Sequence, residues 1–186
     1  GVEAVERGLP GQDALGARFI AADVAGIRFA TVYCPNGKDV DHPDYETKLA
    51  WFDALVEHWR SHCAPELPAV LCGDFNIAPS DLDSHHPDGF EDGIFHTPEE
   101  RLRYRELEGC GLVDLFRDAH PQTQQFSWWD YRGGAFHRNL GLRIDLLLGT
   151  EPVRKRVRDV VIDRDYRKKK GELKASDHAP VYADLD

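Results

Sequence analysis

The chain has 186 residues, 41% of them hydrophobic, so it can form one domain with an apolar core, and no run reaches the ~18 apolar residues of a membrane span. Its formal net charge of -10 argues against indiscriminate binding to nucleic acid. The four cysteines form no Cys-x-x-Cys pair, which favours reduced thiols in a cytosolic protein over a disulfide framework or a zinc site.

The first half of the chain is predicted to alternate strands with a helix. Residues 18–24 and 27–33 are strand-like apolar runs, and Ala25-Gly26 between them suits a two-residue hairpin turn. Over residues 45–62 apolar side chains recur at helical spacing, which predicts an amphipathic helix. A buried strand over residues 68–74 is expected to follow.

The second half continues this alternation, which predicts an α/β or α+β layered domain. Residues 79–97 are polar and are expected to form a long loop. Thr97 suits a helix N-cap and Pro98 the first helical position, so a helix is predicted from there to about Cys110, ending before Gly111. Further strands are expected near residues 125–129, 143–148 and 179–185.

Two polar residues, Asp74 and Asn76, follow the strand at residues 68–74. In extended backbone their side chains would point the same way. A carboxylate that accepts a proton beside an amide that donates a hydrogen bond can handle a water nucleophile and a phosphate oxygen together. Taken alone, a turn that merely closes the strand is the simpler interpretation.

Two further acids stand at predicted strand ends. Asp145 lies in an apolar run, where an aspartate is costly unless it is paired, either with Arg143 or with His178. An acid–imidazole pair orients the ring and raises its pKa. Asp177 adjoins His178 just before the last strand, where the alternative is a structural turn. Three strand ends that present acids, one with an imidazole, suit a divalent metal and phosphate ester chemistry.

Together and in this order, these motifs resemble those of the endonuclease/exonuclease/phosphatase superfamily of metal-dependent phosphodiesterases. The shared elements are Gly73-Asp74-Phe75-Asn76, Arg143-Ile144-Asp145 and Ser176-Asp177-His178-Ala179-Pro180-Val181. Residues 111–117, 126–132 and 139–148 are similar in particular to the exonuclease III-like branch, the apurinic/apyrimidinic endonucleases and 3′-5′ exonucleases of base-excision repair.

The resemblance implies an α/β sandwich of the DNase I-like fold, a four-layer arrangement in which two packed mixed sheets are flanked by helices. It covers residues 1–186 as a single partial domain and begins inside the family's domain. Roughly the amino-terminal third, with a first-strand asparagine and a metal-binding glutamate, is expected to be absent, so the chain on its own is expected to have impaired activity. The start at Gly1 and the lack of methionine fit an amino terminus that is not the gene's.

The resemblance also implies roles for individual residues. Tyr33 would contact the scissile phosphate and Asn76 would help to hold that phosphate in line. His178, paired with Asp145, would bind a phosphate oxygen and stabilise charge in the transition state.

The attacking water and the metal involve two more residues. Asp74 would activate the water, and Asp177 would contribute to a site for Mg²⁺ or Mn²⁺. Which group deprotonates the water stays open between Asp74 and His178. We favour Asp74, with a raised pKa, because a histidine paired with Asp145 tends to be cationic.

Substrate contacts are expected from two groups of residues. Trp128, Leu142 and Ile144 match positions that line a pocket for a sugar without a base, although they fit an apolar core equally well. Residues 154–174 hold ten Lys and Arg against four Asp and Glu. Within that segment Arg167, Lys168, Lys169 and Lys170 either contact DNA phosphates or form a solvated charged loop.

The resemblance therefore implies a DNA-repair nuclease that uses Mg²⁺ or Mn²⁺. It would cleave the phosphodiester 5′ to an abasic site in double-stranded DNA and trim 3′ ends. It would act as a monomer in the cytoplasm, at the nucleoid of a bacterium, and without a membrane. Two alternatives remain: a superfamily phosphatase of phospholipids or phosphoinositides, and a non-catalytic fragment with weak DNA affinity.

Overall fold

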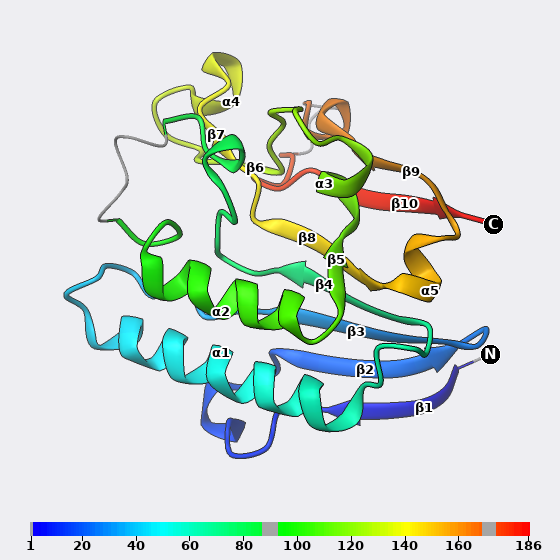
Figure 1. The fold of residues 1–186 in the computed structure, drawn as a ribbon. Helices are drawn as coiled ribbons and strands as arrows, with labels where there is room; N and C mark the ends of the chain where they lie inside the picture. The colour runs from blue at the N-terminus through cyan, green and yellow to red at the C-terminus, as the bar shows by residue number, and fades with distance from the viewer. Residues whose placement is uncertain (1, 87–92, 169–173) are drawn as a thin grey trace.

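The fold is built on one six-stranded mixed sheet, seen in a computed structural model that describes residues 2–86, 93–168 and 174–186 (Figure 1). The strands lie in the order β1-β2-β3-β4-β8-β5, with β3 and β4 parallel and the other pairs antiparallel. Their bounds are β1 Val2–Arg7, β2 Phe19–Val24, β3 Ile27–Tyr33, β4 Ala69–Asp74, β5 Leu112–Asp114 and β8 Asp145–Thr150.

Two long helices cover one face of this sheet, α1 (Pro43–His62) and α2 (Pro98–Gly109) (Figure 1). The apolar side of α1 packs on the buried side chains of β2, β3 and β4, which confirms the predicted amphipathic helix. The start of α2 is also confirmed, because Thr97 and Glu100 form a capping box.

A second, two-stranded sheet lies against the opposite face. It consists of β9 (Val157–Ile162) and β10 (Val181–Leu185), which pair antiparallel. A second apolar core joins these strands and the short helix α3 (Leu115–Ala119) to the outer side of the central sheet. The chain is therefore layered as helices, sheet and sheet, and the predicted mixed α/β architecture is confirmed.

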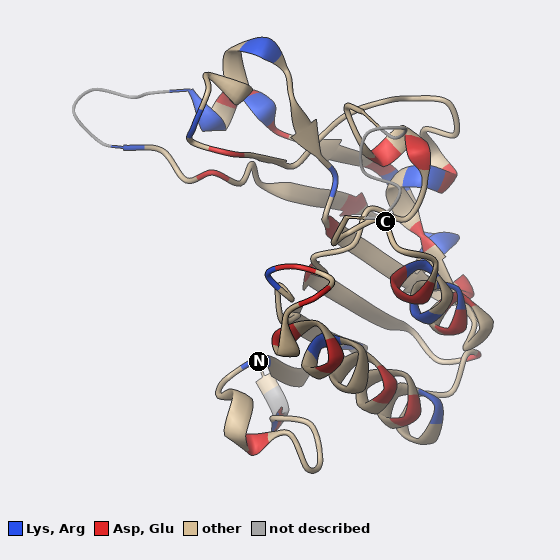
Figure 2. Ribbon diagram, turned by 90° about the vertical axis from the view of Figure 1, so that its left-hand side faces the viewer, with Lys and Arg blue, Asp and Glu red and all other residues tan. Residues whose placement is uncertain are grey.

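Beyond one end of the central sheet lies a small lobe. It holds β6 (Trp128–Trp129) and β7 (Gly141–Leu142), which pair antiparallel, the helix α4 (Ala135–Arg138) and the nearby 3₁₀ turn η4 (Arg164–Arg167). Figure 2 marks several basic residues along the ribbon of this lobe, whereas acidic and basic residues are mixed along α1 and α2. Among the described residues, no helix is both long and apolar enough to cross a bilayer.

The structure corrects several predicted boundaries. The strand expected near residues 125–129 contains only Trp128–Trp129, and the one expected from residue 143 begins at Asp145. Strands β1, β5 and β9 and the helices α3 and α5 (Glu151–Arg154) were not predicted. They are either very short or interrupted by charged residues, so they lack the apolar periodicity on which prediction depends.

Candidate active site

The centre of the candidate site is the point where β4 ends and β8 begins. These strands are antiparallel neighbours in which Asp74 and Asp145 are direct cross-strand partners. Side chains of directly opposite residues project from the same face of a sheet. Tyr33, the last residue of β3, is the partner of Asp74 on the other side. Three predicted site residues therefore lie side by side, at the ends of three neighbouring inner strands.

His178 joins this group through Asp145. Its ring nitrogen Nδ1 lies 2.9 Å from Oδ2 and 3.1 Å from Oδ1 of Asp145. Burial by itself lowers the pKa of His178, but the hydrogen bond and the charge of Asp145, with Asp74 and Asp177 nearby, outweigh burial and raise it. The predicted acid–imidazole pair is thus present, and the alternative pairing of Asp145 with Arg143 is not.

Arg143 instead points into a buried ionic network. Its Nε donates to Asp83 at 2.6 Å, and its two terminal nitrogens donate to Asp114 at 3.1 and 2.7 Å. Arg117 also donates to Asp83, at 2.6 Å. The backbone N–H groups of the next two residues after Arg143 both donate to Ser127 Oγ at 3.1 Å. Together these bonds fix the start of β8, where Asp145 stands.

Asn76 does not continue the strand as the extended interpretation expected. Its φ of +50° is left-handed, a region that asparagine tolerates better than most residues. The turn nevertheless brings the two side chains together, because the Asn76 backbone N–H donates to Asp74 Oδ1 at 3.0 Å and its Nδ2 donates to Oδ2 at 3.2 Å. The turn that the simpler interpretation expected is therefore present, and it places the Asn76 carboxamide beside the Asp74 carboxylate.

The backbone before Asp74 requires glycine. Gly73 has a φ of +129°, and a Cβ at this position would lie 2.1 Å from the carbonyl oxygen of Val32. No side chain fits at that distance, so the close approach of β3 and β4 at the site depends on this residue.

The electrostatics at Asp74 favour proton uptake. Burial, followed by repulsion from Asp145, raises the pKa of Asp74 to about 6, although His178, the Asn76 N–H and Lys48 act in the opposite direction. A carboxylate with such a pKa is mostly ionised at neutral pH and is a stronger base than an ordinary aspartate.

The carboxylates of the site suit a hard cation held partly by water and substrate. Asp177 Oδ2 accepts a hydrogen bond from Trp128 Nε1 at 3.1 Å. Within the described parts of the chain, no three His, Cys, Asp or Glu side chains gather closely enough to form a complete metal cage. Mg²⁺ often binds through one or two carboxylates and completes its shell with water and phosphate oxygens. Burial and then the charge of Asp145 raise the pKa of Asp74, and a cation bound beside it would favour its ionised form.

The predicted substrate-contact residues have different surroundings. Trp128 is half-buried, whereas Leu142 and Ile144 are 4% and 2% exposed, so in this structure those two pack as core residues and a pocket role stays a prediction. Arg167 stacks near the rings of Tyr131 and Phe136.

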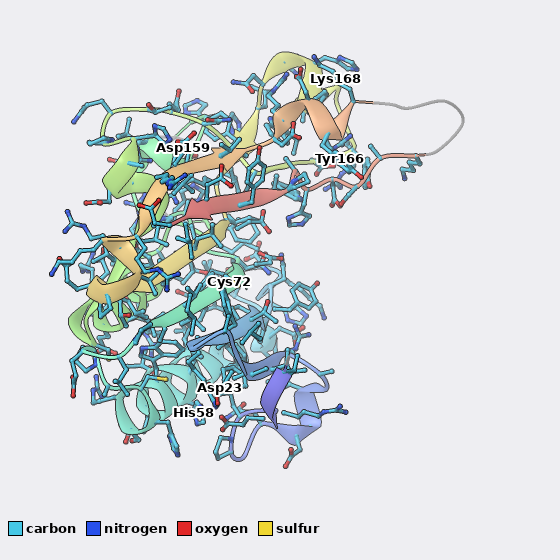
Figure 3. All side chains as sticks on the ribbon, turned by 90° about the vertical axis from the view of Figure 1, so that its right-hand side faces the viewer. Asp23, His58, Cys72, Asp159, Tyr166 and Lys168 are labelled. Carbon is cyan, nitrogen blue, oxygen red and sulfur yellow. The ribbon has the colours of Figure 1, made fainter. Side chains whose placement is uncertain are left out.

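The remaining basic residues are less informative. Lys168, beside Tyr166 in Figure 3, forms an exposed ion pair with Asp165 at 2.7 Å. Lys169 and Lys170 lie outside the described residues.

Sequence reasoning missed Lys48, which is fully buried in α1. Its Nζ donates to the carbonyl oxygen of Asn76 at 2.7 Å and forms an ion pair with Glu100 of α2. A signal was present: Lys48 lies three residues after Tyr45 and four before Phe52, so it falls on the apolar side of its helix, where a charged residue needs a partner.

Comparison with known proteins gives consistent relatives. The chain is 31% identical over 166 residues to the exodeoxyribonuclease of Bacillus subtilis (strain 168), covering 88% of this chain and 62% of the relative. It is 35% identical over 161 residues to exodeoxyribonuclease III of Haemophilus influenzae, covering 82% and 59%. The chain thus spans about three fifths of the length of these curated relatives.

Solved structures confirm the DNase I-like fold. The 3′-5′ exonuclease NExo from Neisseria meningitidis superposes with a TM-score of 0.94 at 40% identity, and an AP endonuclease from Archaeoglobus fulgidus with 0.94 at 34%. Both matches cover 100% of this chain and 72% of the other. The model of the Endonuclease/Exonuclease/phosphatase family matches residues 3–178. The chain therefore belongs to the endonuclease/exonuclease/phosphatase family.

Proposed function

We propose that this protein is a metal-dependent DNA-repair nuclease that hydrolyses phosphodiesters at abasic sites and at 3′ ends of duplex DNA. The observation that carries the proposal is the convergence of a base, an amide and an acid–imidazole pair. Asp74 faces Asp145 across paired strands, Asn76 is bonded to Asp74, and His178 is bonded to Asp145.

Asp74 would act as the general base. Its pKa of about 6 leaves it ionised at neutral pH and ready to accept a proton from water. Its position beside Asn76 puts the proton acceptor next to the amide that would hold the phosphate. The competing role for His178 is disfavoured, because the hydrogen bond and charge of Asp145 raise the pKa of the ring and favour its protonated form, which cannot accept a proton.

His178 would stabilise the phosphate. Because the Asp145 carboxylate is an acceptor for Nδ1, that nitrogen carries a proton, which leaves Nε2 as the second donor of the protonated ring. A charged donor at this point would bind a non-bridging oxygen and stabilise charge in the transition state. Exposed Tyr33, adjacent to Asp74 on β3, would contact the same phosphate.

Asp177 is the residue we assign to the metal, with Mg²⁺ or Mn²⁺ as the ion. The bound ion would supply neutralisation of the phosphate charge and of the leaving 3′ oxygen. The hydrogen bond from Trp128 holds one oxygen of Asp177 in place.

DNA is the substrate class best supported by the relatives. Two are named exodeoxyribonucleases, another solved relative is described as an AP endonuclease, and the 3′ phosphatase NExo from Neisseria is described as bound to a product DNA hairpin, at a TM-score of 0.94 and 39% identity. Exposed Arg138, in α4, and exposed Lys174, whose Nζ lies over the ring of Tyr131, supply positive charge on an otherwise acidic chain, whereas Arg132 is paired with Asp130 at 2.7 Å.

The proposal is tested by offering the 186-residue chain three substrates: a duplex with an abasic-site analogue, a duplex with a recessed 3′ end, and a phosphoinositide in mixed micelles. We expect cleavage of the two duplexes with Mg²⁺ or Mn²⁺, none with EDTA, and none by the Asp74→Asn variant. Turnover of the phosphoinositide alone would support a different phosphatase, and binding of DNA without cleavage would support a non-catalytic role.

A further inference from the structure

Lys48 is a buried charge in contact with the active-site turn. An ammonium group without exposed surface is costly unless each of its protons has an acceptor. Its Nζ donates to the carbonyl oxygen of Asn76 at 2.7 Å, to that of Asn36 at 3.2 Å, and to the carboxylate of Glu100. Three acceptors match the three protons of the ammonium.

Glu100 is itself held in a fixed position. Its Oε2 accepts hydrogen bonds from the backbone N–H and the hydroxyl of Thr97, both at 3.1 Å. The Thr97 hydroxyl in turn lies 2.6 Å from the phenol oxygen of Tyr45 on α1. Glu100 therefore cannot turn away from Lys48 without also giving up the N-terminal cap of α2.

The two carbonyl groups bound by Lys48 belong to the segments that carry the site. Asn36 follows β3 and Asn76 follows β4, and Asn36 Nδ2 donates to Asn76 Oδ1 at 3.3 Å. Asn76 Nδ2 donates to Cys34 O at 2.9 Å as well as to Asp74. The ammonium thus bridges the backbones of two segments whose backbone and side-chain groups fix the carboxamide of Asn76.

The fit around the lysine stem is also tight. Gly37 has a φ of +91°, and a Cβ there would lie 3.0 Å from Cδ of Lys48. The left-handed backbone of Asn76 needs support from tertiary contacts, and its carbonyl group receives a 2.7 Å hydrogen bond from Lys48.

We propose that Lys48, held by Glu100, is a positioning residue that fixes the carboxamide of Asn76 and the carboxylate of Asp74 for reaction. The inference rests on the function proposed above for these two residues. The charge of Lys48 also acts on Asp74, where it opposes the upward pKa shift together with His178 and the Asn76 N–H, against burial and Asp145.

The test compares Lys48→Met, which keeps the volume and removes the charge, with Arg103→Met. Arg103 is a matched control, because it also links α2 to α1, through Asp53 at 2.8 Å and the carbonyl oxygen of Leu49 at 3.1 Å, but it does not contact the Asn76 turn. For Lys48→Met we expect kcat on the abasic duplex to fall about 10- to 100-fold with KM nearly unchanged. The side-chain NH₂ signals of Asn76 in ¹⁵N NMR spectra should also shift or broaden. Arg103→Met should change neither.

Wild-type kcat and unchanged Asn76 signals in Lys48→Met would overturn the inference, as would an equal loss of kcat in Arg103→Met. If Lys48→Met does not fold, Glu100→Gln decides the matter. That variant keeps the ammonium but leaves one oxygen to serve both Lys48 and Thr97, so an approximately threefold or larger fall in kcat with altered Asn76 signals is expected. If the wild-type chain cleaves no DNA, the proposed function fails, and the NMR comparison still tests whether Lys48 fixes Asn76.

Discussion

Two buried cations support the site in different ways: Lys48 supports the turn with Asp74 and Asn76, here called the lysine side, and Arg143 supports the start of β8 with Asp145, here called the arginine side. On one side, the Lys48 ammonium binds the backbone carbonyl groups of Asn36 and Asn76 and holds the catalytic side chains indirectly. On the other, the Arg143 guanidinium binds the side chains of Asp83 and Asp114 and fixes the strand that begins with Asp145. The first support is a compact ammonium group that binds backbone carbonyl groups, and the second is a planar guanidinium group that binds two carboxylates.

This difference predicts that the two cations affect different quantities, Arg143 mainly the stability of the fold and Lys48 mainly the rate of the reaction. Burial disfavours both cations, yet Asp114 and Asp83 raise the pKa of Arg143, whereas the pKa of Lys48 stays lowered despite Glu100. The arginine network is thus strongly coupled and should contribute mainly to folding. The lysine contacts a strained turn that carries reacting groups, so its loss should appear mainly in the rate.

The largest effect is expected at the acid–imidazole pair. Asp145→Asn removes the negative charge that orients the His178 ring and favours its protonated form. The kcat should therefore fall by about 10³- to 10⁴-fold, while the melting temperature stays close to that of the wild type. Single-turnover cleavage of an abasic duplex measures the fall. Asp159→Asn is the matched control, because Asp159 (Figure 3) forms an exposed pair with His120 at 3.4 Å, and its rate should be that of the wild type. A comparable loss in both variants would contradict the assignment of Asp145.

The second effect is on folding. Arg143→Met leaves Asp114 and Asp83 buried without their main partner, so the free energy of unfolding should fall by about 3–5 kcal/mol. Urea denaturation followed by circular dichroism measures it. Arg154→Met, which breaks an exposed pair with Asp118, should leave the denaturation midpoint unchanged. Equal midpoints for the wild type and Arg143→Met would show that the arginine network does not support the fold.

The third effect is an increase in the free energy of unfolding, and it concerns Asp74 on the lysine side. The pKa of Asp74 is raised from its ordinary 3.8 to about 6, so ionisation costs folding free energy at every pH above that interval and nothing below it. Asp74→Asn should therefore stabilise the chain by up to about 3 kcal/mol at pH 7.5 and should have almost no effect at pH 3.5. Thermal unfolding at the two pH values measures the difference. A stabilisation that is the same at both would mean that the charge of Asp74 is not its cause.

The sequence is more informative about the arginine side than about the lysine side. Asp145 and His178 could be paired in advance because each stands in a recognisable motif at a predicted strand end. The conformation of Asn76 could not, because its left-handed turn is held by contacts with residues distant in the sequence, among them Cys34 and Lys48. Long apolar segments such as α1 and β4 were predictable from periodicity, whereas β9 was not, because arginine and aspartate interrupt it.

The supporting residues illustrate why the rest was beyond prediction. The partners of Lys48 come from three separate parts of the chain, at Asn36, Asn76 and Glu100, which meet only after α1 and α2 pack on the same face of the sheet. Such contacts between distant residues cannot be predicted from the spacing of residues in the sequence. Only the presence of a lysine on an apolar helix side indicated that some buried partner was required.

The smallest effect is the pH dependence of the rate, and it tests whether Asp74, on the lysine side, is the general base. With a pKa of about 6 for Asp74, roughly one tenth of the molecules carry the ionised base at pH 5 and nearly all do at pH 8. At a fixed Mg²⁺ concentration, kcat/KM for the abasic duplex should therefore rise by up to about tenfold between these values, and by less where the bound cation lowers the pKa of Asp74. Lys48→Met should move the rising limb to higher pH, because a cation that favours the ionised form of Asp74 is lost, whereas Arg103→Met should leave it in place. A limb that ends near pH 4 in the wild type, or that stays unmoved in Lys48→Met, would assign the base to another group.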